Sequence, residues 1–383
     1  MATTGNDSNS GTEKTPFLTI HKAVNTMVAG DTTYVRGGLY VGAGVRFRRS
    51  GTAAAPIKLL NYPGESPIYQ CLSNLTADGQ MFLIQHGAGS INPIGWITIE
   101  GFEVRHCSRG VKFYNLHDSV IRRNWMHDTY NTPIQGNGAR ILIDRNIIND
   151  VGKVERAHGI YANGTAFTIT NNLIYDVTYY GIQQNGSGSS LYDSTKHAGP
   201  EFAGAQNWVV AHNTFAYNGG TEGAAYVIWG RGCTNLRIEN NIFYENAPAR
   251  SNNVAQAIHF LSSQPLSGVT IRNNLSYATG SGGLGFIASG GRVEGVDYTQ
   301  SGNVVNTDDP RFVNAPATLP ASPNFALTER SPAIDKGVPH AAITTALDGT
   351  PRPQGHAYDI GAYEYKAGVD LKSPAAPIAL QIH

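Results

Sequence analysis

The sequence is short of charged residues, cysteines and long apolar runs, and each shortage excludes a class of protein. Only 15% of the 383 residues are charged, and 28 basic side chains balance 28 acidic ones to a formal net charge of zero. Proteins that bind mainly nucleic-acid phosphates or anionic membranes need an excess of Lys and Arg, so neither partner is expected. No stretch approaches the roughly 20 consecutive apolar residues of a membrane-spanning helix.

The three cysteines, Cys71, Cys107 and Cys233, are too few for a disulfide framework. An odd number in a chain of this length predicts small buried side chains with at most one bridge. The sequence contains no CxxC pair and no Cys/His cluster that would indicate a zinc site. We expect neither a metal nor a cofactor. The first 13 residues are polar and lack the apolar segment of a signal peptide.

Glycine (44 residues) and asparagine are abundant, and much of the asparagine belongs to a repeated pattern. Seven segments related to Ile-x-x-Asn-x-Ile recur, with gaps of 23, 22, 26, 41, 28 and 33 residues between their anchor positions. The base period is therefore about 22 to 26 residues, with insertions in some repeats. The anchors are Gly101, Asn124, Asn146, Asn172, Asn213, Asn241 and Asn274.

A second short strand lies between successive anchors, as in the segments 159–162 and 181–184. Each repeat thus holds strands with a period of two, separated by Gly and Asn turns. One such repeat cannot bury its apolar face alone, whereas stacked repeats form a solenoid with a continuous core. Strand-only repeats of this length predict an all-β parallel β-helix. We expect each anchor Asn to turn inward at a bend and to bond to the Asn of the next coil.

The repeat and the N-terminal run together resemble the right-handed parallel β-helix proteins of the pectate-lyase-like superfamily. The run comprises the segments 16–24 (PFLTIHKAV), 29–32 (AGDT), 34–40 (YVRGGLY) and 61–65 (NYPGE). It is similar to the opening of family 9 pectate lyases and of family 6 alginate and chondroitin lyases. The resemblance covers most of residues 12–365, and it implies a right-handed parallel β-helix that acts on polysaccharides.

Both ends of an open solenoid need a cover, because they expose unpaired strands and core. Ile20, Ala23, Val24 and Met27 recur at helical spacing, which predicts an N-terminal capping helix over residues 19–29. Residues 331–364 resemble the terminal segment that covers the C-terminal coils of other β-helices. We therefore divide the chain into a flexible N-terminus (1–15), a single β-helix domain with its caps (16–366) and a C-terminal tail (367–383).

The outer face of the second strand set is the candidate site, because alternate side chains of a strand point outward. A core-facing Ile160 places Tyr161 outside. The same register places four further side chains there: Lys112, Gln135, Gln183 and His259. With coils about 4.8 Å apart, the row from Lys112 to Gln183 would be on the order of 14 Å long, which matches a few sugar units. Other side chains suited to sugar binding flank this row: Arg109, Tyr130, Arg156, His158, Tyr180, His197 and Glu222.

The resemblance to polysaccharide lyases implies β-elimination at a uronic acid. This reaction needs a base for the C5 proton, an acid for the leaving oxygen and a cation for the carboxylate. We expect His158 and Tyr161 to supply the base and the acid, and Arg156 and Lys112 to bind the uronate. The Asp-Gly-Phe-Ala-Ala-Lys strand and the calcium-binding Asp cluster of family 9 lyases are missing. The expected lyase is therefore metal-independent.

Two other functions remain open from the sequence. A glycoside hydrolase needs two carboxyl groups about 5 to 10 Å apart, and the candidates are Glu155, Glu201 and Glu222. We interpret three other carboxylates, which follow the anchors at a constant offset, as turn residues: Asp128, Asp150 and Asp176. A non-catalytic glycan-binding β-helix is the third reading. The largest insertion, residues 187–204, either walls a groove or is decoration. We expect a polysaccharide partner, a monomer, and a secreted or periplasmic location reached with a leader that this sequence lacks.

Overall fold

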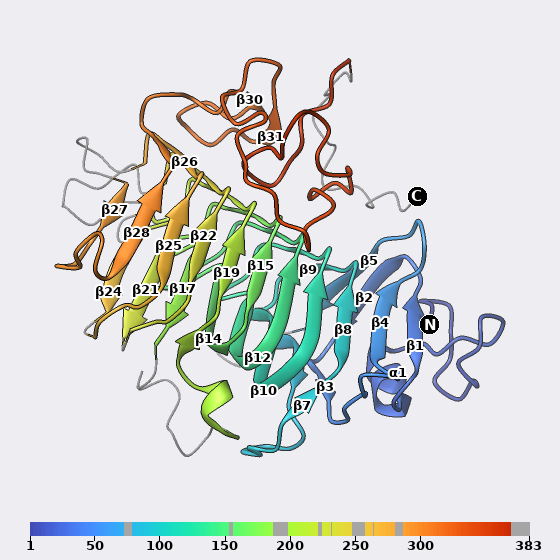
Figure 1. Cartoon of the computed structure of the whole chain (residues 1–383). Coiled ribbons are helices and arrows are strands. Elements are labelled where there is room, and N and C mark those ends of the chain that lie inside the picture. The colour runs from blue at the N-terminus through green and yellow to red at the C-terminus, as the bar shows by residue number, and fades with distance from the viewer. Residues whose placement is uncertain are drawn as a thin grey trace.

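Parallel strands stack coil upon coil into a solenoid in the computed structural model of the chain (Figure 1). The structure describes residues 1–72, 79–152, 156–186, 198–220, 224–230, 232–246, 257–262, 264–279 and 286–368. Within these residues every strand pairing in the two large sheets is parallel, and the main hydrophobic core includes residues of coils from the N-terminal end to β28. The predicted all-β parallel β-helix is confirmed.

Two sheets form the wall of the solenoid. The larger one covers two faces, because β10 and β12 continue through the bend between them, where the facing residues Asp118 and Arg140 have φ values of 46° and 57°. Its 19 strands are β1 (Thr32–Val35), β3 (Val45–Phe47), β4 (Ile57–Asn61), β6 (Gln80–Ile84), β7 (Ile94–Gly95), β8 (Ile97–Glu100), β10 (Arg109–Arg122), β12 (Ile134–Asp144), β14 (Ile160–Thr165), β15 (Thr168–Thr170), β17 (Ile182–Asn185), β18 (Ala205–Gln206), β19 (Val209–Ala211), β21 (Tyr226–Gly230), β22 (Arg237–Glu239), β24 (Ile258–Ser262), β25 (Val269–Arg272), β27 (Ile287–Ala288) and β28 (Tyr298–Ser301). The 10-stranded sheet comprises β2 (Gly38–Gly42), β5 (Pro67–Cys71), β9 (Glu103–Arg105), β11 (Trp125–Met126), β13 (Ile147–Ile148), β16 (Leu173–Tyr175), β20 (Thr214–Ala216), β23 (Ile242–Tyr244), β26 (Leu275–Tyr277) and β29 (Val304–Val305).

The anchor asparagines form a continuous hydrogen-bonded ladder at the bend between the two sheets, as predicted. In Asn172, the backbone N–H and Nδ2 both donate to Oδ1 of Asn213 at 2.9 Å, and Nδ2 also donates to the carbonyl of Ile143. The residue before each rung has a left-handed φ, such as 53° at Asn171, which makes the sharp bend. The rungs are Asn124, Asn146, Asn172, Asn213, Asn241, Asn274 and, beyond the predicted anchors, Asn303.

A second bend in each coil explains the carboxylates that follow the anchors. Asp128, Asp150 and Asp176 have φ values of 47°, 48° and 54°. Asp and Asn tolerate this left-handed conformation better than most residues, because their short polar side chains bond locally. Their interpretation as turn residues agrees with this geometry.

The helix α1 (Ile20–Thr26) packs against β3 near the N-terminal end of the solenoid (Figure 1). Thr19 caps it by accepting a hydrogen bond from the backbone of Lys22, and Ile20, Ala23 and Val24 are buried. The helix is three residues shorter at its C-terminal end than predicted, because Met27 has an extended ψ of 136°. In the described part of the chain no helix is long and apolar enough to cross a membrane.

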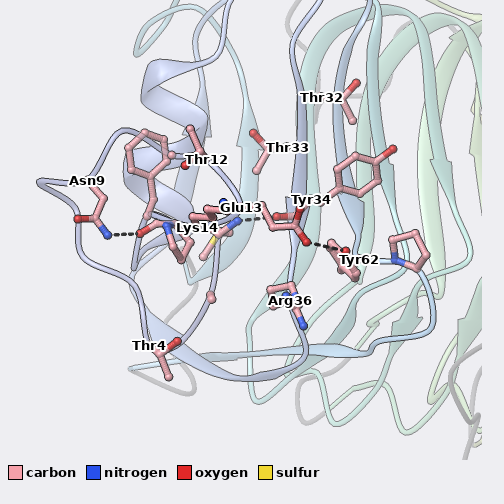
Figure 2. A pocket seen from close by; sticks show the side chains of 16 residues that line it. Thr4, Asn9, Thr12, Glu13, Lys14, Thr32, Thr33, Tyr34, Arg36 and Tyr62 are labelled. Carbon is pink, nitrogen blue, oxygen red and sulfur yellow. Dashed lines mark hydrogen bonds between the residues drawn. The ribbon is translucent and has the colours of Figure 1, made fainter.

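The N-terminal segment before α1 lies against β1. The amino group of Met1 donates to the carbonyl of Tyr34 at 2.6 Å. A cavity of about 670 Å³ lies between this segment and β1. Figure 2 shows side chains that line it, among them Tyr62, whose hydroxyl donates to Glu13. The proposed division into 1–15, 16–366 and 367–383 stays a prediction, and residues 369–383 lie outside the described part.

The C-terminal segment runs along one side of the solenoid and covers its later coils (Figure 1). It carries the antiparallel pair β30 (Phe312–Asn314) and β31 (Asn324–Leu327). Ile360 and Leu347 pack with Leu173, Ile242 and Leu275 of the 10-stranded sheet. The segment is itself held by a fully buried ion pair, Arg352 with Glu364 at 2.6 Å. These contacts provide the expected cover.

One disulfide, Cys71–Cys107, links neighbouring coils, and Cys233 is a buried free thiol. The pair joins the end of β5 to the turn after β9, its partner strand in the 10-stranded sheet. The prediction of at most one bridge is confirmed.

Candidate functional site

The predicted row of outward side chains exists. Lys112 of β10 lies opposite Gln135 of β12, which lies opposite Tyr161 of β14 and then Gln183 of β17. The row continues through Val227 of β21 to His259 of β24. The neighbours Val111, Ile134, Ile160 and Ile182 face the core and are fully buried, as the period of a strand requires.

The row is covered over most of its length, which alternation alone does not predict. Tyr161, Gln183 and His259 keep only 4%, 7% and 6% of their surface exposed. Lys112 and Gln135 are half-buried, so the row opens towards solvent at this end. Among the described residues, this face is therefore most accessible to a polymer beside Lys112 and Gln135.

His158 lies in a cluster of tyrosines immediately before β14. Its ring centroid is 5.1 Å from that of Tyr161 and 5.4 Å from that of Tyr179, and the ring is nearly parallel to Tyr180 at 5.5 Å. The backbone N–H of His158 donates to Thr132. Its Nδ1 is buried without a hydrogen-bond partner. Burial lowers the pKa of His158 to about 3, so the ring is neutral at neutral pH.

The flanking residues take up different positions around the row. Arg109 is buried, and its Nε donates to Oε1 of Gln135 at 2.6 Å, which fixes both side chains. The ammonium of Lys112 lies 5.4 Å from the centre of the Tyr114 ring. Tyr130 is half-buried in the turn before β12.

Arg156 is exposed and has a left-handed φ of 62°, two residues before His158. The structure thus brings His158, Tyr161 and Tyr180 together, whereas Arg156 points to solvent from the turn. The predicted site residues His197 and Glu222 lie outside the described residues. The catalytic and binding roles of the whole set stay predictions.

A second outward row, two residues further along the same strands, was not predicted. Asn137, Asn163, Asn185 and Trp229 lie opposite one another in β12, β14, β17 and β21. Trp229 is 42% exposed, although the three asparagines are almost completely buried. The alternation Tyr226-Val227-Ile228-Trp229 carried the signal, because Trp229 must face the same side as Val227.

Carboxylates are scarce on this face of the described strands. Neither of the two outward rows contains Asp or Glu. Glu201, a predicted hydrolase candidate, forms an ion pair with Arg140 at 2.8 Å. Among the described residues no group of three His, Cys, Asp or Glu could hold a metal ion. The donor set of His, Tyr, Gln, Asn and Lys does not fit the calcium site of family 9 lyases, which prefers several carboxylates.

Burial of neutral His158 is expected to make the protein less stable in acid. Its folded pKa near 3 lies below the ordinary value of 6.5, so stability is lost as the pH falls from about 6.5 towards 3. Between pH 7 and pH 4, denaturant unfolding should show the wild type losing roughly 3 kcal/mol more than His158→Gln. His21→Gln, at an exposed position of α1, is the control and should behave as wild type. Equal losses in wild type and His158→Gln would contradict the expectation.

Comparison with known proteins now adds the family. Residues 1–208 match the family model described as "Pel9A-like, right handed beta helix region". The chain belongs to the Pel9A-like right-handed β-helix family. A second model, "right handed beta helix region", matches residues 156–305 of this Pel9A-like chain. The predicted right-handed fold is thereby confirmed.

Proteins that are similar to this Pel9A-like chain include lyases and a lacto-N-biosidase. Over 65 residues it is 43% identical to pectate lyase PEL9 of Emericella nidulans. These residues make up 17% of this chain and 16% of that relative. The GH136 lacto-N-biosidase from Eubacterium ramulus gives a TM-score of 0.58 at 14% identity, covering 79% of this chain and 59% of that one.

Two solved lyase structures are similar over longer parts of their chains. A rhamnogalacturonan lyase gives a TM-score of 0.53 at 16% identity, covering 85% of this chain and 95% of the other. Pectate lyase Pel9A gives 0.50 at 15% identity, covering 96% of both chains. At these identities the structural likeness shows the fold.

Proposed function

We propose that this Pel9A-like protein is a secreted enzyme that cleaves a uronic-acid-containing polysaccharide by β-elimination. The observation that carries the proposal is the pairing of neutral His158 with Tyr161 on the outward face of the solenoid. Histidine and tyrosine can together move the two protons that the reaction requires. The names of the pectate and rhamnogalacturonan lyases with this fold support a polysaccharide as the substrate.

In the proposed reaction His158 is the base and Tyr161 the acid. His158 takes the C5 proton of the uronate, the electron pair forms the C4–C5 double bond, and the bond from C4 to the leaving oxygen breaks. Tyr161 donates a proton to that oxygen. Lys112 and Arg156 neutralise the carboxylate, which makes the C5 proton more acidic. Each step uses groups of this chain alone.

The scarcity of carboxylates on the outward rows favours elimination over hydrolysis. A glycoside hydrolase uses two carboxyl groups on either side of the bond. The alternative of a hydrolase with loop carboxylates draws support from the lacto-N-biosidase fold. It would have to release Glu201 from Arg140 or use residues outside the described part.

A secreted or periplasmic location is part of the proposal. The Cys71–Cys107 disulfide supports it, because such bridges persist mainly in oxidising compartments. A charge of zero means that attraction to a polyanion must come from local cations such as Lys112.

A panel of polysaccharides assayed in two ways tests the function. Pectate, alginate, glycosaminoglycans and neutral glycans are incubated with the protein, and both ultraviolet absorbance and new reducing ends are followed. We expect one acidic polymer to give both signals in parallel, because elimination leaves an unsaturated uronate. Reducing ends without absorbance would show a hydrolase instead. The absence of both signals on every polymer would favour the non-catalytic glycan-binding β-helix.

A further inference from the structure

The second outward row contains a large aromatic side chain that is open to solvent, Trp229, and continues beyond it to Leu261 of β24. Trp229 is 42% exposed, whereas its neighbours Ile228 and Tyr226 are fully buried in the core. It lies opposite Asn185, which in turn lies opposite Asn163. An exposed tryptophan on this face is a flat apolar surface with a polar N–H at its edge.

Two asparagines of the same row, Asn185 opposite Trp229 and Asn163 one coil further on, have buried polar atoms with no hydrogen-bond partner. Oδ1 of Asn163, an acceptor, and Nδ2 of Asn185, a donor, are both in this state. The other ends of the two amides are occupied, since Asn163 donates to the carbonyl of Phe202 and Asn185 accepts from Gln183. Native proteins leave few buried polar groups unsatisfied, because each one is destabilising. A donor and an acceptor on adjacent coils, next to an open indole, suit a ligand that carries hydroxyl groups.

We propose that Trp229, Asn185 and Asn163 form a subsite for one pyranose ring of a glycan. The C–H face of the sugar stacks on the indole of Trp229, one hydroxyl accepts from Nδ2 of Asn185, and another donates to Oδ1 of Asn163. These three side chains are uncharged, so the subsite recognises ring shape and hydroxyls, and its contribution to binding is insensitive to salt. The assignment of a glycan to this face rests on the proposed function, but binding here does not need the elimination reaction.

The spacing places this subsite about two sugars from the proposed catalytic pair. Trp229 is two coils beyond Tyr161 and two residues further along the strand. With about 4.8 Å per coil and 3.3 Å per residue, the separation is about 12 Å between the two Cα positions. A disaccharide bound at Tyr161 can lie beside Asn163, two residues along the same strand, but it cannot reach Trp229, whereas an oligosaccharide of four or more units can.

Binding of oligogalacturonides with two, four and six sugars to Trp229→Ala tests this proposal. The variant is made in the His158→Ala background, so that ligand is not consumed, and calorimetry is carried out at low and high salt. The unchanged background protein and Tyr34→Ala, which removes another exposed aromatic ring in β1, serve as matched controls. We expect the affinity for the hexamer to fall about tenfold in Trp229→Ala only, equally at both salt concentrations, with no change for the dimer.

Neutral xylo-oligosaccharides of the same lengths separate this proposal from the proposed function. If the polysaccharide panel gives no unsaturated product but hexamers of either kind still bind through Trp229, the subsite stands and the elimination reaction falls. Equal hexamer affinity in Trp229→Ala and its background overturns the subsite, even if the enzyme proves to be a lyase. Equal weakening of dimer and hexamer, or no binding of any oligosaccharide to the background protein, also overturns it. Circular dichroism confirms that each variant is folded.

Discussion

Replacing Asn213 by Ala is expected to lower the free energy of unfolding by about 3–4 kcal/mol. Oδ1 of Asn213 accepts two hydrogen bonds from Asn172, and its Nδ2 donates to the carbonyl of Ile169 and to Oδ1 of Asn241. The side chain is fully buried in the middle of the ladder. Alanine would leave the donors of Asn172, the carbonyl of Ile169 and Oδ1 of Asn241 each without one hydrogen bond in a buried site.

Urea unfolding followed by circular dichroism measures this loss. Asn92→Ala, at an exposed position of the chain, is the matched control and should change stability by less than about 0.5 kcal/mol. Asn213→Asp tests the two halves of the amide, because aspartate keeps the acceptor but loses the donor and adds a buried charge. It should be at least as damaging as alanine. A change in Asn213→Ala no larger than in Asn92→Ala would show that the ladder does not hold the coils together.

The sequence was a good guide to the solenoid because its coils are built from local patterns that repeat. Each anchor Asn directly follows the bend and bonds to its counterpart in the next coil, so one residue type at one spacing reveals both the turn and the stacking. The last rung, Asn303, was missed because its segment, Ser301-Gly302-Asn303-Val304, lacks the isoleucine that marks the others. The helix was predicted too long because apolar spacing continues through Val28, although the backbone leaves the helical conformation at Met27.

The site was only partly predictable, because a strand pattern gives the direction of a side chain and not what lies over it. Alternation placed Lys112, Gln135, Tyr161 and Gln183 in one row, and the register agrees. The burial of His158 depends on Tyr179 and Tyr180 at the start of the next coil, which no spacing rule brings together. The same holds for the disulfide, since three cysteines allow three pairings and only the fold selects one.

The substitutions His158→Ala and Tyr161→Phe are each expected to lower kcat/KM, measured by the formation of unsaturated product, by about 10² to 10⁴-fold. Tyr161→Phe removes only the hydroxyl and keeps the ring beside His158, so it separates proton transfer from packing. If the two residues act in the same elimination step, kcat/KM of the double variant should be only slightly lower than that of the less active single variant, because effects within one catalytic unit do not add.

Controls for these variants come from the same residue types elsewhere in the chain. Tyr34→Phe in β1 and His21→Gln in α1 change exposed side chains away from the row, and both should keep wild-type rates. The folded pKa of His158 near 3 also predicts that the acid limb of kcat/KM lies well below pH 6, because the base stays unprotonated until strong acid. If Tyr161→Phe kept full activity while His158→Ala lost it together with its stability, His158 would support the tyrosine cluster and the elimination would need another pair of groups. Loss of activity in both variants, with unfolding curves like that of the wild type at pH 7, is the result that assigns the proton transfers to this pair.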